Sequence, residues 1–359
     1  MRRSLKRFLS KPWVRRVVVG LSLAYPVTLL AAALVFRFVG ERWWVSGVVM
    51  FLPRLAFALP LLVLVPLLFV LGERRVLHAQ AVSVLLVLFP LMGFVLPGPA
   101  PATSGPVLRL LSFNVNSLFA GPEQVFREIV AHAPDVVLVQ ESSGEAKFEE
   151  LFRGRYPFVE TSTQFLVASR WPVATTSPER LSYEGRSRSP RFMRHVIRTP
   201  AGPVTFYNVH PLSPRESFYE LRGNDGFRKE LRSGRIFSGS AASVIEANAG
   251  LRRLQIETIA RLASEESGPV VVAGDLNQPD PSPLTGGTLG ELRDAFREGG
   301  WGFGYTFPAS EFKARRTPKI PWMRLDRVLL RGPIATKRFA VGCEGVSDHR
   351  CVIADLARP

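Results

Sequence analysis

The stretch Val270–Asp280 reads VVVAGDLNQPD and places reactive groups directly after an apolar run. Three β-branched residues and an alanine are typical of a short buried strand. Gly274 ends the run, and Asp275 and Asn277 then follow with a spacing that puts both side chains on one side of an extended segment. The structural alternative is an Asx turn before Pro279. The stretch therefore predicts a carboxylate and an amide presented together at a strand end.

The same arrangement recurs along the last 250 or so residues of the chain. Short runs rich in Val, Leu and Phe are each followed or preceded by polar residues. Strands that each present a polar group at one end can converge on one site. Two stretches with helical spacing, Glu123–His132 and Ala241–Ser264, lie between some of these runs. The predicted strands and their polar neighbours are Leu108–Phe113 before Asn114, Asp135–Val139 before Gln140 and Glu141, Val204–Val209 before His210, Leu325–Leu330 with Asp326, and Cys351–Ala354 after Ser347–His349.

Six motifs, in this order, resemble the endonuclease/exonuclease/phosphatase (DNase-I-like) superfamily in a membrane-anchored bacterial form. They are LSFNV (111–115), VQE (139–141), NVH (208–210), GDLN (274–277), RLDRVLL (324–330) and SDH (347–349). The resemblance runs from near Leu108 to the C-terminus. It implies an α/β fold, a four-layer α/β/β/α sandwich with the site at one end of its two sheets.

The resemblance also implies a metal-dependent hydrolase of phosphate esters, a phosphodiesterase, nuclease or phosphatase that uses Mg²⁺ or Mn²⁺. It assigns Glu141 to the cation, with Asn114 close to both metal and phosphate and Asp348 available to the metal region. Mg²⁺ prefers oxygen ligands and usually takes one or two carboxylates, which fits this assignment. Asn116 is a weaker candidate for substrate binding.

The catalytic roles follow from the same resemblance. Asp275 would activate or orient the attacking water, and Asn277 would donate a hydrogen bond to a phosphate oxygen. His210 would donate to a non-bridging phosphate oxygen. Asp326 would orient His349, which would stabilise charge at phosphorus or act as general acid or base. The alternative from another class is a non-catalytic, membrane-tethered binding module that retains the fold.

Several polar residues lie near these motifs without a predicted catalytic role. Arg191, Arg194 and His195 are expected to be solvated charges of a strand. Tyr207 and Tyr305 are equal candidates for a substrate-side tyrosine, so neither is assigned. The charged segment Arg215–Arg235 has three readings: a substrate rim, a surface on lipid headgroups, or a solvated loop or helix face.

Cys343 and Cys351 bracket the SDH motif. A disulfide is permitted if the domain lies outside the cytoplasm, and the two cysteines could sit on adjacent antiparallel strands. Zinc binding together with His349 is the alternative, but the spacing is not a usual zinc pattern.

The first 100 residues differ in composition from the remainder. They hold 12 Lys/Arg against 2 Asp/Glu, whereas the rest holds 34 against 28, so +10 of the net charge of +16 lies there. Basic groups near an anionic lipid surface each contribute about 1 kcal/mol of attraction, so the basic balance does not require nucleic acid. The charge is therefore mainly a property of the N-terminal part.

Three uncharged apolar stretches predict about three transmembrane helices: Val17–Phe36, Leu55–Leu71 and Ala79–Leu96. A cleaved signal peptide would explain only the first of them. Two or four spans remain alternatives because Arg54 must snorkel or pair. We expect a membrane region at 1–97, a Pro/Gly/Ser/Thr linker at 98–106 and a catalytic domain at 107–359.

Orientation follows from the basic residues that precede the first span, which place the N-terminus in the cytoplasm. Three crossings then predict an integral membrane protein with an extracytoplasmic catalytic domain, periplasmic or extracellular. The expected partners are the lipid bilayer and an anionic phosphoester substrate, either a lipid headgroup or a nucleic acid. No obligate protein partner is inferred.

Overall fold

The structure, a computed structural model, describes residues 11–96, 98, 102–103, 105–142, 144–220, 232, 239–309 and 320–358. It divides into two compact units, one of Met1–Phe94 with Pro281–Pro283 and one of Val95–Asp280 with Leu284–Pro359. Two predictions rest on residues outside the described ones. These are the basic cluster of residues 2–7 and most of the segment Arg215–Arg235.

The first unit is helical, as its apolar sequence predicts. Three helical stretches are long and apolar enough to cross a membrane: Pro12–Phe38, Arg54–Leu71 and Arg74–Leu91. The third ends before the predicted Leu96 because Gly93, with φ of +76°, turns the chain out of the helix. The helices of this unit are α2 (Pro12–Phe38), α3 (Trp44–Met50), α4 (Leu61–Leu71) and α5 (Leu77–Leu86), with short turns η1 (Gly40–Arg42), η2 (Arg54–Ala58), η3 (Arg74–Val76) and η4 (Val87–Leu91).

Polar side chains inside this unit donate to backbone carbonyls. Arg54 is buried, and its Nη1 donates to the carbonyl of Leu91 at 2.9 Å. Gln80 Nε2 donates to the carbonyl of Ser22 at 2.8 Å. A polar group in an apolar surrounding is costly without such a partner. Arg54 therefore pairs within the unit, one of the two arrangements that the sequence left open.

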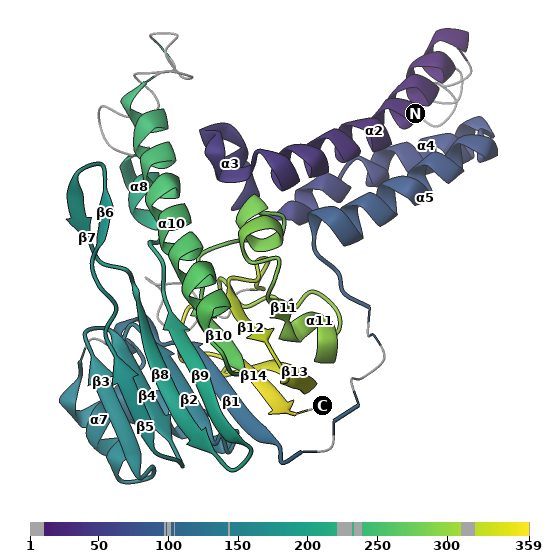
Figure 1. The fold of residues 1–359 in the computed structure, drawn as a ribbon. Coiled ribbons are helices and arrows are strands. Elements are labelled where there is room, and N and C mark those ends of the chain that lie inside the picture. The colour runs from purple at the N-terminus through teal and green to yellow at the C-terminus, as the bar shows by residue number, and fades with distance from the viewer. Residues whose placement is uncertain are drawn as a thin grey trace. The chain divides into compact units, whose positions relative to one another are not determined.

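Two six-stranded sheets form the second unit (Figure 1). The first has the order β13-β14-β1-β2-β4-β3 and the second β11-β12-β10-β9-β8-β5. The strands of the first are β1 (Leu108–Asn114), β2 (Val136–Gln140), β3 (Phe158–Ser162), β4 (Phe165–Ser169), β13 (Ala335–Gly342) and β14 (Cys351–Ala357). Those of the second are β5 (Val173–Thr176), β8 (Phe192–Thr199), β9 (Gly202–Val209), β10 (Val270–Asp275), β11 (Arg293–Asp294) and β12 (Asp326–Arg331).

The remaining elements of this unit are short, apart from one long helix. They are the hairpin strands β6 (Leu181–Tyr183) and β7 (Arg186–Arg188), the helices α6 (Pro122–Ala131), α7 (Ala146–Arg153), α8 (Arg215–Glu220), α10 (Ser240–Glu265) and α11 (Ala295–Gly299), and the turns η5 (Asn116–Leu118) and η6 (Leu284–Thr288).

Strand alternation divides the core of this unit into layers. Leu110 lies in the cluster between the two sheets with Phe206 and Val271. Its neighbour Leu111 faces the other way and packs against Ile129 of α6. On the outer face of the second sheet, side chains of α10 pack against β9 and β10. The mixed α/β fold predicted from the sequence is confirmed, and its packing gives four layers in the order α/β/β/α.

Two buried amides join the sheets near one end. Gln140 Nε2 donates to Asn208 Oδ1 at 2.7 Å, and Asn208 Nδ2 donates to the carbonyl of Val139 at 3.1 Å. Both side chains are fully buried. Separating the sheets here would leave buried amides unpaired, at about 1–3 kcal/mol for each group.

The expectation that His195 is a solvated charge is wrong. Ile197, two residues further along β8, packs between the sheets, so alternation turns His195 to the same interior side. His195 is buried, and its Nδ1 lies 2.7 Å from Thr175 Oγ1. Burial lowers the pKa of His195 to about 3. Arg194 points the other way and pairs with Glu266 at 2.6 Å.

Burial of His195 makes the stability of the fold sensitive to acid. Below its ordinary pKa of 6.5 the unfolded chain gains a proton that the folded chain does not bind, so stability falls between pH 6.5 and about 3. We expect a loss of about 2 kcal/mol at pH 5 relative to neutral pH from this residue alone. Urea unfolding of the full chain in detergent at the two pH values measures it.

His195→Leu should flatten this pH dependence. Equal slopes for wild type and His195→Leu would contradict the assignment.

Candidate active site

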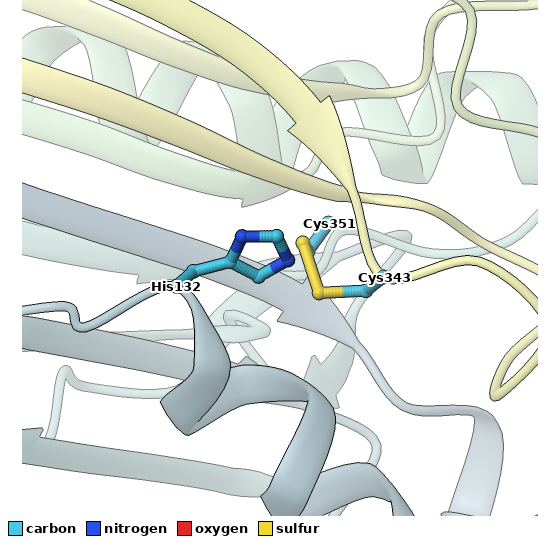
Figure 2. Close-up of side chains that lie close together, drawn as sticks. All are labelled: His132, Cys343 and Cys351. Atoms are coloured by element: carbon cyan, nitrogen blue, oxygen red, sulfur yellow. A yellow bond between two sulfur atoms is a disulfide. The ribbon is translucent and has the colours of Figure 1, made fainter.

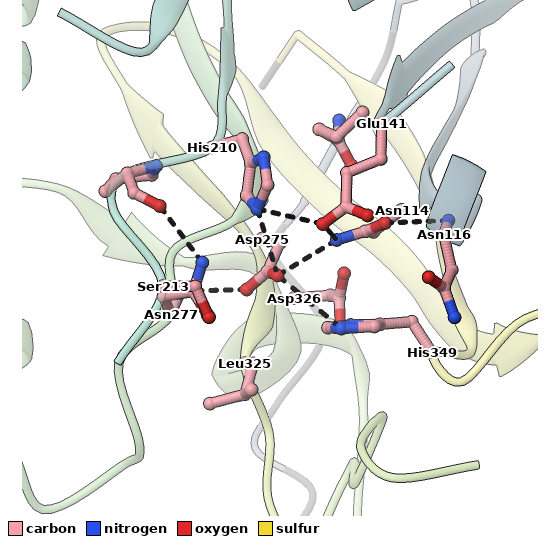
Figure 3. Close-up of polar contacts among 12 residues, drawn as sticks. Asn114, Asn116, Glu141, His210, Ser213, Asp275, Asn277, Leu325, Asp326 and His349 are labelled. Atoms are coloured by element: carbon pink, nitrogen blue, oxygen red, sulfur yellow. Dashed lines mark hydrogen bonds and ion pairs between the residues drawn. The ribbon is translucent and has the colours of Figure 1, made fainter. Parts of the chain in front are cut away.

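The polar endings of the strands meet at one end of the two sheets. β1 and β2 are parallel, as are β9 and β10, so their carboxyl ends share an edge. β12 and β14 run antiparallel to their neighbours and therefore begin at that edge. The predicted residues brought together there are Asn114, Glu141, His210, Asp275, Asn277, Asp326 and His349 (Figure 3).

Asn114 connects the two sheets at the centre of this site. Its Nδ2 donates to Glu141 Oε1 and to Asp275 Oδ2, both at 3.1 Å. Its Oδ1 accepts from the backbone N–H of Asn116 at 3.0 Å. The amide therefore presents donors to the two carboxylates and places them side by side.

His349 lies between two carboxylates. Its Nδ1 donates to Asp326 Oδ2 at 2.8 Å, and its Nε2 is 3.6 Å from Asp275 Oδ2. Burial alone would lower the pKa of His349, but the charges of Asp326 and Asp275 outweigh it and raise the pKa to about 10. His349 is therefore a cation at neutral pH. Burial raises the pKa of Asp275 above its usual range, and the cation of His349 counteracts this effect.

His210 has the opposite protonation state. Its Nδ1 lies 2.7 Å from Gln164 Oε1, a contact that requires the proton on Nδ1. Its Nε2 faces Glu141 Oε1 at 3.4 Å and Asp275 Oδ2 at 3.7 Å. Burial lowers the pKa of His210 to about 4 against the opposing charge of Asp275. The ring is therefore neutral at pH 7, with an unprotonated Nε2 directed at the carboxylates. In this state Nε2 accepts rather than donates, which differs from the phosphate-donor role that the resemblance implies.

The GDLN motif forms a tight turn that aims Asp275. Gly274 has φ of +150°, and a Cβ there would lie 2.0 Å from the carbonyl oxygen of Val209. Asp275 Oδ1 accepts from the backbone N–H of Asn277 at 2.8 Å, which leaves Oδ2 for the site. Asn277 Nδ2 donates to the carbonyl of Pro211 at 3.0 Å. Asp275 therefore makes an Asx-turn contact through Oδ1 and still faces the site through Oδ2.

Asp348 and Asn116 take other positions. Asp348 Oδ2 accepts from Arg215 Nη2 at 2.9 Å, so this carboxylate faces an arginine. Ser347 Oγ donates to the carbonyl of Asn114 at 2.7 Å and ties the SDH turn to β1. Asn116 lies beside Asn114 with its side chain buried. Tyr207 points out of the site, and its hydroxyl donates to Glu266 at 2.8 Å.

The residues around Glu141 suit a divalent cation. Glu141 Oε1 and Asp275 Oδ2 lie 3.4 and 3.7 Å from the unprotonated Nε2 of His210, and all three atoms present lone pairs. Such a cluster is unfavourable without a positive charge between its members, and hard divalent cations prefer carboxylate ligands. A second group, Asp275, Asp326 and His349, has ligating atoms within 4.8 Å of one another. This group is a second candidate for metal binding, in which an ion would replace the proton on His349 Nε2.

Sequence reasoning missed the residues that hold the His210 loop. Gln164 fixes the His210 ring from the loop between β3 and β4. Gln255 accepts from the backbone N–H of Leu212 at 2.8 Å, and Arg252 Nη1 donates to the carbonyl of Leu212 at 3.3 Å. Arg252 and Gln255 are polar residues with i, i+3 spacing on a buried helix face, and that pattern is the signal that could have revealed them.

Cys343 and Cys351 form a disulfide across the SDH turn, with His132 beside it (Figure 2). Gly342 pairs with Cys351 in the sheet, so the cysteines lie at the end of adjacent antiparallel strands. The disulfide that the sequence permitted is thus formed. Because both sulfur atoms are bonded to each other, the zinc alternative is not supported.

Comparison with known proteins gives the family. The profile of the Endonuclease/Exonuclease/phosphatase family matches residues 111–349, so the chain belongs to that family, whose members hydrolyse phosphoesters. No curated protein matches the chain.

Solved structures resemble the chain at low identity. Sphingomyelinase C from Streptomyces griseocarneus is 20% identical, with a TM-score of 0.45 over 70% of this chain and 99% of its own. Humanized TDP2 from D. rerio is 18% identical, with a TM-score of 0.45 over 70% and 98%. A family protein from Leptotrichia buccalis is 15% identical, with a TM-score of 0.48 over 69% and 99%. These remote likenesses add no argument to the family match.

The disulfide should stabilise the SDH turn. Its cysteines are 8 residues apart. The unfolded-state entropy of so short a loop predicts about 2–3 kcal/mol of stabilisation. We expect Cys343→Ser/Cys351→Ser to lower the melting temperature by roughly 5–10 °C, as measured by thermal unfolding with and without a thiol reductant. Reductant should not affect the double variant further. A wild type that melts identically with and without reductant would contradict this.

Gln164 should support activity by orienting His210. In Gln164→Leu the Nδ1–H of His210 loses its acceptor, and we expect the rate of phosphodiester hydrolysis to fall on the order of tenfold. Gln164→Glu retains an acceptor and should keep more activity than Gln164→Leu. Initial rates of the two variants, with circular dichroism as a folding control, decide the matter. Undiminished activity of Gln164→Leu would show that the contact does not matter.

Proposed function

We propose that the protein is a membrane-tethered phosphodiesterase that depends on a divalent cation. The observation that carries the proposal is the cluster around Asn114. There a partly exposed carboxylate, Glu141, lies beside the buried Asp275, and a neutral and a protonated histidine flank Asp275. Separate acceptor and donor groups at one reacting centre are what hydrolysis of a phosphate ester requires.

Each residue has a role in this reaction. Asp275 Oδ2 is the acceptor that orients the attacking water and takes its proton. The cation of His349, held by Asp326, stabilises negative charge that develops on the phosphoryl oxygens. Asn277 fixes Asp275 through its backbone N–H and holds the turn to Pro211. Asn277 would lie beside the phosphate on the Asp275 side.

Glu141 would hold the cation, with Asp275 and His210 Nε2 facing the same point and Asn114 fixing the two carboxylates. Mg²⁺ or Mn²⁺ in this position would lower the energy of negative charge on a phosphate oxygen. Asn114 donates from its amide nitrogen, so its support of the metal is through Glu141. Asp348, paired with Arg215, supports the site from the side of His349.

The membrane tether is part of the proposal. Its support is the three apolar helices and the basic N-terminus, which favour a catalytic unit outside the cytoplasm by the positive-inside rule. The disulfide is compatible with an oxidising compartment. A C-terminal reporter that fluoresces only in the cytoplasm tests this placement, and a bright signal would reverse it.

Activity of the full chain in detergent tests the chemistry. We expect hydrolysis of a bis-aryl phosphodiester with Mg²⁺ or Mn²⁺, and loss of it with EDTA. Glu141→Gln, Asp275→Asn and His349→Gln should each lower the rate by about 100-fold or more, because each removes a charge from the reacting centre. The exposed Arg153→Gln is the matched control and should stay within twofold.

Two results would overturn the proposal. Activity that is unaffected by EDTA would show that the reaction needs no divalent cation. Activity that survives Asp275→Asn and His349→Gln would show that these residues do not form the active site. A chain that binds phosphoesters but hydrolyses none would favour the alternative of a tethered binding module.

A further inference from the structure

The last apolar stretch ends in a tight turn. Gly93 has φ of +76°, and the N–H of Phe94 donates to the carbonyl of Leu88 at 2.9 Å. A left-handed glycine, followed by a residue whose N–H bonds back to the last helical turn, is the Schellman motif. This motif closes a helix and fixes the direction of the chain that leaves it. Val95 is the next residue, so it lies within one residue of the helix end.

Val95 already belongs to the core of the second unit. Its side chain is buried with Phe296 between the two sheets. Its N–H donates to the carbonyl of Gly302 at 2.8 Å, and its carbonyl accepts from the N–H of Gly302 at 2.9 Å. The predicted linker at 98–106 follows this anchor rather than preceding it. The covalent chain therefore keeps Gly302 close to the end of the last apolar stretch.

Two apolar side chains beside this pair are exposed, Leu96 by 63% and Trp301 by 73%. Val95 and Gly302 pair in antiparallel register, so Leu96 and Trp301 are the next residues opposite each other. Trp301 is the only mostly exposed aromatic side chain in the described part of the second unit. A single exposed apolar residue is ordinary, but two in register at the exit of an apolar helix form a patch that suits lipid.

We propose that this patch, Leu96 and Trp301, inserts into the headgroup region of the bilayer and holds the catalytic unit against the membrane surface. The inference rests on the membrane tether of the proposed function. Trp is enriched at membrane interfaces because its large ring is apolar and its N–H still finds a polar partner. The headgroup region is roughly 5–7 Å deep on each face, a depth that the first residues after the helix end reach.

The same segment leads to the active site. Phe307 follows Gly302 by five residues, and its ring contacts that of His349 with 4.8 Å between centroids. Five residues span at most about 18 Å. Contact of the patch with lipid would therefore keep the reacting centre near the bilayer surface.

A single labelled cysteine tests the contact on the full chain in lipid nanodiscs. The two native cysteines are bonded to each other, so Trp301→Cys supplies the one free thiol for an environment-sensitive fluorophore. Val63→Cys, in the second apolar stretch, reports on the membrane interior. Arg153→Cys is the matched exposed position within the catalytic unit.

Arg153 is a suitable control because it lies at the other edge of the first sheet. Its partner Glu149 accepts from Thr161 of the edge strand β3 at 2.8 Å. The helix α11, just before Trp301, packs on the opposite edge strand β13 (Figure 1). Five strand spacings separate these edges, a distance of about 24 Å.

Lipids that carry a nitroxide near the headgroup should quench the label at residue 301 at least about threefold more strongly than the label at residue 153. The label at residue 63 should instead be quenched best by a nitroxide deep in the acyl chain. Trp301→Cys should hydrolyse a soluble bis-aryl phosphodiester within about twofold of wild type, because Trp301 lies outside the reacting centre.

A second measurement reads the native side chain. The tryptophan emission of wild type minus that of Trp301→Phe is the share of Trp301, and Phe keeps an apolar ring in its place. In nanodiscs of brominated lipid this share should fall about twofold relative to nanodiscs of the unbrominated lipid, because the indole lies among the lipids.

Equal quenching at residues 301 and 153, or an unquenched Trp301 share, would overturn the inference while the tether stands. Protection of the label at residue 301 only in nanodiscs that hold two copies of the chain would also overturn it, and would assign the patch to a second copy. If the label at residue 63 is not quenched either, the chain is not in the bilayer, and the proposed tether fails together with the inference.

Discussion

The site depends on the hydrogen bonds that Gln140 and Asn208 make between the two sheets. These two buried amides bridge the sheets, one residue before Glu141 and two residues before His210. A buried amide without a partner is costly, so the bridge sets the spacing of the two sheets at this end. Glu141 and His210 come from different sheets, and their 3.4 Å separation requires that spacing. Asn114 then adds a second bridge, from β1 to Asp275.

The same burial acts in opposite ways on the two histidines of the site. His210 is surrounded by one acceptor amide and two carboxylates at 3.4 and 3.7 Å, and desolvation prevails. His349 has a direct contact to Asp326 at 2.8 Å, and the charges prevail. Three carboxylates, Asp326, Asp275 and Asp348, favour the protonated form of His349, whereas the like charges of Arg191 and His349 add to the effect of burial on His210. The site therefore contains both an unprotonated imidazole nitrogen, on His210, and a protonated imidazole, on His349.

Much of the fold could be predicted from the sequence because local patterns encode it. The strand runs and the helix Ala241–Ser264 appear as α10 and its neighbouring strands with shifts of one or a few residues. The predictions from sequence are wrong where tertiary packing outweighs the local preference of a residue. His195 is polar by type but faces the interior because its strand position does. The third apolar stretch is shorter as a helix because Gly93 leaves the helical conformation.

The sequence by itself determined which groups stand at strand ends. The alternation of apolar residues in a strand and the Gly, Asp and Asn residues that end it are local properties. Asn114, Glu141, His210, Asp275, Asp326 and His349 were all named from it, and the structure brings them to one edge. Only the tertiary structure decided how they are oriented. Gln164 on His210, Arg215 on Asp348 and the two amides between the sheets join residues at least 46 positions apart. Such contacts depend on the register and spacing of two sheets, which no local pattern encodes.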